Sequence, residues 1–589
     1  MQSPEDRYLR LGQAALLLGA VGSVVALSFR PLTDYDLPWN LATGRIIWST
    51  RSIPRVDDLA FTARPLRYVE PLGDLLLFLT HQAFGPRGLQ VLGALLGGSI
   101  LLTLYAVGRR AGPMALLVTG FAAAALADWF YLRPVLFSYA ALPLTLLCLS
   151  VHRACPGTRR GHLALGGLVL LHLAWANIHG FVALGCALVV GYAGFRLAAR
   201  FGPERAARWF PGRDGSDLGW TSGAAALVLV ASSLSPGGPR LLLGSLRYGE
   251  VNTGITEWAR PDVHYFLYDQ PIATAFVATV VIAWLAGQDP ESRRRVPDAF
   301  SLGVVSLALF AFFHAVRMTP TAIVLLGAIA PVRLSGWVRS RSVAAIACAA
   351  APLAAMAWIA LSLPLAGPAG FDQTRLPEGA VRYVEVHDLR GHPYNFSPFG
   401  GYLAWRLHPG QRVFMDGRNA LARESALVER ARRAQSDAEV FHALVREFGM
   451  TWALTSAEEG TLHDRPLAAA REWALVYLDD VGAVYVRRDG PNGQLAAEGY
   501  HWLRHLVAPA RVLELALRGE LREELGHDGA LALEQAPLSP RAAFLDACGA
   551  LANRDAPRFQ AAQRHLAEVA PAHPAAAVLA QAWARSLGR

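Results

Sequence analysis

The stretch Thr33-Asp34-Tyr35-Asp36-Leu37-Pro38-Trp39-Asn40-Leu41-Ala42-Thr43-Gly44 follows the first long apolar run of the chain. Pro31 ends the preceding helix and Pro38 keeps a helix from running straight through, which predicts a loop or a short extended piece. In an extended chain Asp34 and Asp36 would point to the same side. Two carboxylates just past a membrane helix are costly unless they face a wet cavity or bind something. The pair therefore predicts a polar site at the mouth of a helix bundle.

The composition separates an apolar front part from a more charged rear part. Of the 589 residues, 53% are hydrophobic and 17% are charged, unlike an average soluble protein. Apolar runs of span length continue to about residue 363, and beyond it none remains. We predict a membrane domain at 1-363 with a large first outer loop at 30-87, a small α/β domain at 364-490 and a helical domain at 491-589.

About eleven apolar runs are candidate membrane spans, which predicts an α-helical polytopic domain. They lie at approximately 11–29, 88–107, 113–127, 134–151, 162–178, 181–198, 220–235, 271–287, 299–316, 318–333 and 342–363. Arginines cluster in alternate connections, as at Arg109-Arg110, Arg159-Arg160 and Arg293-Arg294-Arg295, whereas the intervening connections hold Arg133 and Arg317 singly. This positive-inside pattern predicts a cytoplasmic N-terminus and places the loops 30–87 and 236–270, with everything after 363, outside.

The outer tail has strand and helix signals in its first part and only helix signals in its second. Strands are expected at 411–415, 451–454 and 482–486, and a helix is expected from a Ser436 cap to Phe448. The last portion, 542–585, resembles helix hairpins of tetratricopeptide (TPR-like) type, although no clean repeat recurs.

Charge and cysteine content exclude two classes of function. The net charge of +9 comes from arginines on membrane-facing loops, with no basic patch interleaved with aromatics, so a nucleic-acid partner is excluded. The five cysteines are scattered without metal-ligand spacing, which argues against a disulfide framework or a cysteine metal site.

Several short motifs recur in a shared order across residues 30–420. After the acidic stretch come Ile53-Pro54-Arg55-Val56-Asp57, Arg133-Pro134, Trp175-Ala176-Asn177-Ile178-His179-Gly180, Ser235-Pro236-Gly237-Gly238-Pro239-Arg240, Glu257-Trp258, His314 with Arg317, Gly400-Gly401-Tyr402 and Asp416-Gly417-Arg418. In this order they resemble bacterial polytopic proteins of the GT-C glycosyltransferase class, which is related to protein O-mannosyltransferases and oligosaccharyltransferase catalytic subunits.

The resemblance implies an inverting membrane transferase that moves a sugar from a polyprenyl-phosphate donor to a glycan, lipid or protein acceptor at the outer face of a bacterial inner membrane. Asp34 or Asp36 would be the base or would hold a divalent metal such as Mg²⁺ or Mn²⁺. The leaving lipid phosphate needs cations, and Arg133 and Arg317 suit it. The remaining candidates for substrate binding are His179, His314, Asn40 and Glu257.

The sequence also departs from that class. Pro38-Trp39-Asn40 stands where relatives often have Trp-Trp-His, and Pro71-Leu72-Gly73 stands where His-Glu-Trp is usual. Asn40 can still form hydrogen bonds but does not titrate. These departures leave open a non-catalytic envelope protein that keeps the fold. A lipid or polysaccharide transporter is the third possibility, although neither internal repeats nor mid-span charges are evident.

The same residues have plainer interpretations. Arg133 and Arg317 could be interface anchors, and His179 could cap a tight turn. Glu257 could be a solvated neighbour of an interfacial tryptophan. Asp416-Gly417-Arg418 is expected to be a turn closed by an ion pair.

Overall fold

The chain forms two compact units, each built from separate stretches of sequence. The first unit draws on Met1–Asp34, Gly44–Ile53 and Arg67–Gly370, and the second on Tyr35–Thr43, Pro54–Leu66 and Phe371–Arg589. The computed structural model describes residues 17–62, 70–204, 208–210, 217–244, 256–287, 297–335, 370–420, 425–458, 460 and 463–586. The expected span at 342–363 lies outside the described residues.

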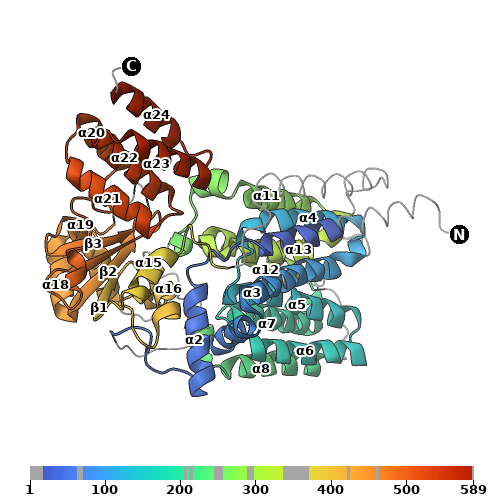
Figure 1. Ribbon diagram of the computed structural model, residues 1–589. Coiled ribbons are helices and arrows are strands. Elements are labelled where there is room, and N and C mark those ends of the chain that lie inside the picture. The colour runs from blue at the N-terminus through green and yellow to red at the C-terminus, as the bar shows by residue number, and fades with distance from the viewer. Residues whose placement is uncertain are drawn as a thin grey trace. The chain divides into compact units, whose positions relative to one another are not determined.

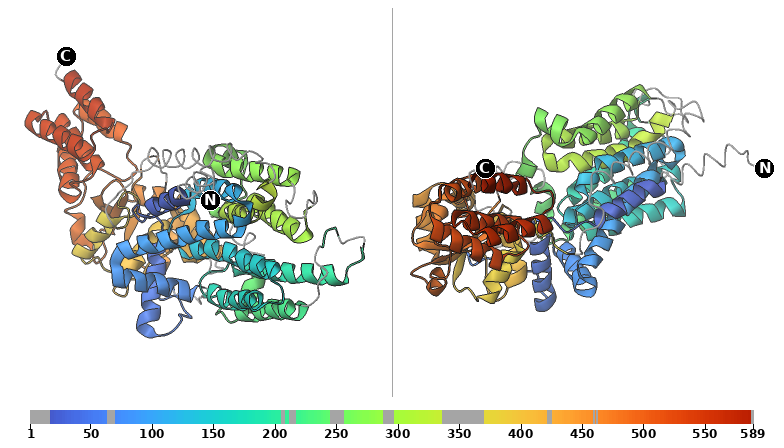
Figure 2. Two further views of the ribbon diagram at one scale, coloured as in Figure 1. Left: turned by 90° about the vertical axis from the view of Figure 1, so that its right-hand side faces the viewer. Right: turned by 45° about the horizontal axis from the view of Figure 1, so that its top comes forward.

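The described part of the first unit consists of helices. After the apolar helix Leu17–Ser28 come α2 (Leu37–Thr50, shared with the second unit), α3 (Pro71–Gly108), α4 (Pro113–Ala125), α5 (Pro134–Ala154), α6 (Arg159–Trp175), α7 (Val182–Phe201), α8 (Leu218–Ser233), α9 (Pro239–Gly244), α11 (Pro271–Ala286), α12 (Ala299–His314) and α13 (Thr319–Leu334). Helix α5 packs against α3, α6 and α7, and α13 packs against α3, α4, α11 and α12 (Figures 1 and 2). Most residues of α13 are buried, so it forms the middle of this bundle.

Length and composition make many of these helices suitable for a membrane. Four described helical segments are long and apolar enough to cross one: Pro71–Ala111, Pro134–Ala154, Val182–Phe201 and Val316–Leu334. Five shorter apolar helices accompany them. Their positions follow the expected runs closely, and the count of about eleven spans stays a prediction.

Two helices differ from what the sequence suggested. Helix α2 was not expected, yet Pro38 occupies its first turn, where the missing N–H costs no hydrogen bond. Helix α3 begins at Pro71, which extends the expected 88–107 run, and it bends at Gly85, whose φ of 62° is the left-handed region that glycine tolerates. Gly44 lets α2 approach α3, since a Cβ there would lie 2.2 Å from the Asp74 carbonyl oxygen.

The second unit is built on a four-stranded sheet with the order β1-β2-β4-β3. Its strands are β1 (His392–Asn395), β2 (Met450–Ser456), β3 (Trp473–Leu478) and β4 (Gly482–Arg487), with β1 parallel to β2 and the other pairs antiparallel. The helices of this part are α15 (Glu378–Val386), α16 (Ser397–Leu407), α17 (Ser425–Ala434), α18 (Ala438–Phe448) and α19 (Arg465–Ala469). The expected strands at 451–454 and 482–486 are therefore present.

Two local predictions for this unit were wrong. Residues 411–415 do not join the sheet; instead Val413 bridges to Ala60, and the Phe61 N–H donates to the Val413 carbonyl at 3.1 Å. The helix cap is Asp437 rather than Ser436, because the Asp437 carboxylate accepts from the Glu439 and Val440 N–H groups.

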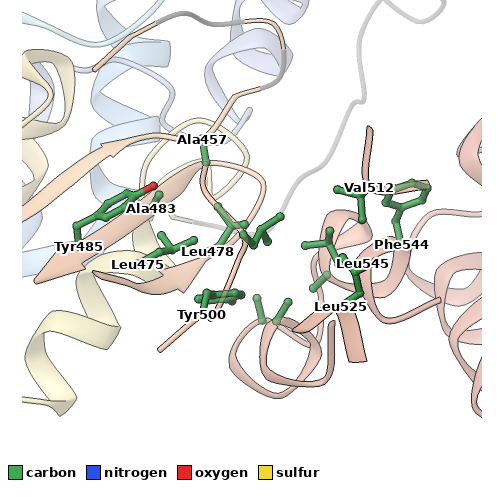
Figure 3. Close-up of a cluster of buried hydrophobic side chains, with 14 of the residues drawn as sticks. Ala457, Leu475, Leu478, Ala483, Tyr485, Tyr500, Val512, Leu525, Phe544 and Leu545 are labelled. Atoms are coloured by element: carbon green, nitrogen blue, oxygen red, sulfur yellow. The ribbon is translucent and has the colours of Figure 1, made fainter. Parts of the chain in front are cut away.

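The C-terminal helices share a hydrophobic core with the sheet. They are α20 (Pro509–Arg518), α21 (Arg522–Gln535), α22 (Pro540–Ala552), α23 (Ala556–Val569) and α24 (Ala575–Ser586). One cluster contains Leu478 of β3, Leu525 of α21 and Phe544 of α22 (Figure 3). Successive helices pack as hairpins, and their tetratricopeptide character stays a prediction.

Candidate active site

Arg133 lies at the start of α5 and is 4% exposed. Pro134 follows it as the first helical residue, so Arg133 keeps an extended backbone with φ −154°. Its Nη2 donates to Glu257 Oε1 at 2.6 Å and to the Tyr131 hydroxyl at 2.6 Å. A buried guanidinium is stable only with such partners.

Glu257 bridges two guanidinium groups. Besides Arg133, it accepts from Arg317 Nη1 at 3.3 Å through Oε2. Burial by itself would raise the pKa of Glu257, but the charges of Arg133 and Arg317 together outweigh burial and hold that pKa below its ordinary value. Glu257 is therefore ionised at neutral pH. We call Asp34, Arg133, Glu257 and Arg317 the ion cluster.

Asp34 joins the ion cluster through Arg133. Its Oδ2 lies 3.5 Å from Arg133 Nε, and the Asp34 side chain is 11% exposed. Arg133 therefore connects two acidic residues from distant parts of the sequence. Burial raises the pKa of the neighbouring Tyr131 to about 12, so this phenol stays protonated at neutral pH.

His179 lies in the turn between α6 and α7 and is 5% exposed. Its Nδ1 is 2.9 Å from the Ser138 hydroxyl, which also accepts from Trp175 Nε1 at 2.7 Å. Its Nε2 is 3.6 Å from Glu70 Oε1. Burial lowers the pKa of His179 well below its ordinary value, and the positive charges of Arg317 and Arg133 lower it further. His179 is therefore a neutral hydrogen-bonding group.

The other residues singled out from the sequence have different surroundings. Asp36 belongs to the second unit, where its Oδ1 accepts from Trp39 Nε1 at 3.0 Å and lies against Gly417. Asn40 is fully buried in α2 and donates to the Asp36 carbonyl at 2.9 Å. His314 stacks on Phe310 at 4.8 Å and takes no part in the ion pairs of the described residues. The described contacts of Asp34 and Asp36 thus fall in different units, and a site shared by the two carboxylates stays a prediction.

The motif Asp416-Gly417-Arg418 is closed by an ion pair, as expected. Arg418 Nη2 lies 2.5 Å from Asp416 Oδ2 and 3.0 Å from Asp57 Oδ1, with all three side chains buried. This triad ties the segment around Asp57 to the rest of the second unit.

A divalent metal at Asp34 fits the surroundings poorly. The Arg133 guanidinium 3.5 Å from Asp34 Oδ2 already supplies positive charge, and a second cation there would be repelled. Asp36 Oδ1 accepts a hydrogen bond from Trp39 Nε1, and Asp36 belongs to the second unit. Use of a metal stays a prediction. The chemistry proposed below uses no metal.

Sequence reasoning missed Tyr131 and Glu70, and it gave no role to Ser138 although Phe137-Ser138 belongs to the motifs shared with the GT-C class. Tyr131 and Ser138 flank the Arg133-Pro134 motif, and their closeness to that motif in the sequence is the signal that could have identified them. Glu70 carried no signal, because its contact to His179 depends on how distant segments fold together.

No protein-family model matches the chain, and no curated protein matches it. Solved structures match the chain. The Archaeoglobus fulgidus oligosaccharyltransferase, tethered with an acceptor peptide, has a TM-score of 0.52 at 11% identity, covering 76% of this chain and 69% of that one. The same archaeon's oligosaccharyltransferase AglB, in complex with an inhibitory peptide and a dolichol-phosphate, has a TM-score of 0.50 at 12% identity, covering 77% of this chain and 70% of that one.

A bacterial structure is also similar. ArnT from Cupriavidus metallidurans, bound to undecaprenyl phosphate, has a TM-score of 0.48 at 15% identity and covers 81% of this chain and 97% of that one. At these identities the likeness to the archaeal structures concerns the fold. The chain has the GT-C-like membrane fold that its motifs predicted.

Proposed function

We propose that the protein is an integral-membrane glycosyltransferase that moves a sugar from a polyprenyl-phosphate donor to an acceptor at the outer face of a bacterial inner membrane. The ion cluster carries this proposal. The structurally similar AglB binds a dolichol-phosphate, which is a polyprenyl phosphate of the same chemical kind.

The two arginines are spaced to hold one anion. Arg133 and Arg317 reach the two oxygens of a single carboxylate, that of Glu257, at 2.6 Å and 3.3 Å. A phosphate has comparable size and presents more oxygens, so it can compete with Glu257 for the same guanidinium groups. In the reaction the bond from the anomeric carbon to the phosphate oxygen breaks, and the leaving phosphate gains negative charge. Guanidinium groups already in place stabilise that charge without reorganising.

Asp34 is the proposed base. The acceptor atom forms the new bond to the anomeric carbon, and its proton passes to the Asp34 carboxylate. Contact between Arg133 and Asp34 would place the base next to the group that holds the leaving phosphate. His179, neutral and fixed by Ser138, is suited to hydrogen-bond the sugar or the phosphate at the same end of the helices.

The location follows from the arginine pattern. The ion cluster lies at the start of α5, and the arginine-rich connections lie at the opposite end of the same helices. Under the positive-inside rule we infer an outer location for the ion cluster and the second unit and an inner one for the N-terminus.

One observation favours a non-catalytic envelope protein. The guanidinium groups of the ion cluster are neutralised by acidic residues of the chain itself, as in a structural network. The two functions separate in one experiment. Membranes that contain the full chain or its Asp34→Asn variant are supplied with a labelled polyprenyl-phosphate sugar, and labelled product is measured. Enzyme function predicts product from the wild type and at least a hundredfold less from the variant at equal abundance. Absence of product with a panel of such donors would support the scaffold.

A further inference from the structure

A second polar region lies at the other end of the same helices. A cavity of about 690 Å³ is lined by the ends of α3, α5, α11 and α13 and by the starts of α6 and α12. The residues of α5 that line the cavity begin at Leu146, 13 residues after Arg133, so the cavity starts about 20 Å along the helix from the ion cluster. Its volume is in the range of ligand-binding pockets.

The cavity has an apolar interior and a basic rim. Apolar lining comes from Val107, Leu146, Leu149, Phe300 and Val332, with Tyr192 beside them. Five arginines line it as well: Arg109, Arg110, Arg153, Arg160 and Arg333. Asp298 is the one acidic residue among the described residues that line it. We call it the arginine cavity.

The arginines are not all neutralised. Arg153 pairs with Asp298 at 3.1 Å. Arg333 is 6% exposed, and its guanidinium donates to the carbonyl oxygens of Trp284 at 3.1 Å and Gly287 at 2.5 Å, at the C-terminal end of α11. Arg109 and Arg160 are exposed and form no ion pair within the described part of the chain. The described lining residues of the arginine cavity therefore carry more positive than negative charge, five arginines against one aspartate.

The positive-inside rule alone does not explain this arrangement. That rule needs arginines on loops, but it needs neither a cavity with apolar walls nor a buried guanidinium at its edge. Arg160 also lies in the first turn of α6, where the helix dipole disfavours a cation.

We propose that the arginine cavity binds the headgroup phosphate of an anionic phospholipid from the leaflet at that end of the helices. Arginine side chains bind phosphate oxygens in a bidentate way, and basic pockets between membrane helices hold such headgroups. The apolar walls suit the glycerol and upper acyl carbons. Leu102 of α3, one helical turn before the lining residue Ala106, is 48% exposed and continues the apolar surface away from the cavity.

The test compares two lipids on the purified full chain. Phosphatidylglycerol and phosphatidylcholine with identical acyl chains are added to delipidated protein in detergent, and retained lipid is counted by native mass spectrometry. We expect phosphatidylglycerol to be retained about tenfold better than phosphatidylcholine. The double variant Arg109→Gln, Arg160→Gln should lose most of that preference, because each arginine near an anionic lipid raises the binding constant by about a factor of five. The matched control is Arg159→Gln, an exposed neighbour that does not line the cavity.

Three outcomes would overturn the proposal. Equal retention of the two lipids would exclude recognition of the headgroup charge. An equal loss in the Arg159→Gln control would show a general charge effect. Displacement of phosphatidylglycerol by an equal concentration of glycerol phosphate would assign the cavity to a water-soluble phosphate instead of a lipid. The Arg109→Lys, Arg160→Lys variant keeps the charge and should keep at least half of the preference, which distinguishes binding from misfolding.

Discussion

Arg133 and Glu257 form an ion pair of 2.6 Å although they lie 124 positions apart in the sequence. The pair joins the start of α5 to the short turn Thr256–Trp258, and Arg317 extends it to the start of α13. Three segments thus meet through one carboxylate. Whether this carboxylate keeps the arginines in place or competes with substrate decides how the ion cluster works.

Replacing Glu257 separates those possibilities. Glu257→Gln removes the charge that competes for Arg133 and Arg317, so affinity for a polyprenyl phosphate should rise several-fold, while the free energy of unfolding falls by about 1–3 kcal/mol through the lost charged hydrogen bonds. Lipid binding and thermal unfolding of the purified chain check both effects. Weaker lipid binding by this variant would mean that Glu257 positions the arginines and does not compete.

The two acidic residues of the first motif should differ in activity. Asp34→Asn is expected to lower sugar transfer by about 10²–10⁴-fold, because the proposed base is lost. Asp36→Asn should be milder, since an amide oxygen can still accept from Trp39 Nε1. Rates of transfer from a labelled donor give the comparison. The control variant is Asp269→Asn, because Asp269 is an exposed residue just before α11. A larger loss in Asp36→Asn than in Asp34→Asn would reverse the assignment.

The buried triad of the second unit should stabilise the fold strongly. Arg418→Met leaves Asp57 and Asp416 facing each other without a cation, which should cost about 3–5 kcal/mol in free energy of unfolding. Arg412→Met removes an exposed pair with Asp58, from the same segment, and should cost less than about 1 kcal/mol. Chemical denaturation of the full chain in detergent measures both. Equal effects would contradict a structural role for the triad.

The second unit should lose stability in mild acid. Burial lowers the pKa of His505 from 6.5 to about 4, and the neutral ring is held by the Tyr485 hydroxyl at its Nδ1 and the His463 carbonyl at its Nε2. The unfolded chain therefore binds this proton first, and stability falls as pH drops from 6.5 toward about 4, by about 3 kcal/mol in total.

Unfolding of the wild type and His505→Gln between pH 7.5 and 4.5 tests this expectation. The variant should be less stable at pH 7.5 but lose less stability on acidification. Parallel pH profiles for the two proteins would assign the acid sensitivity to other groups.

Helices and charges near the motifs were predictable from the sequence, whereas contacts between distant segments were not. The apolar runs locate α5, α7 and α13 because burial in a bundle or membrane requires apolar residues throughout. The Asp416–Arg418 pair was predictable because it closes within one turn. The bridging role of Glu257 was not, since nothing local distinguishes it from a solvated neighbour of Trp258. The strand expected at 411–415 does not join the sheet, and among the described residues Val413 forms one bridge, to Ala60.

Binding of a polyprenyl phosphate tests the central claim most directly. Dissociation constants of undecaprenyl phosphate and of uncharged undecaprenol are measured for the wild type, Arg317→Gln and the exposed control Arg260→Gln. The account predicts that the wild type prefers the phosphate, that Arg317→Gln weakens phosphate binding at least about tenfold without changing undecaprenol binding, and that the control matches the wild type. Equal affinity of the wild type for the phosphate and the alcohol would contradict it.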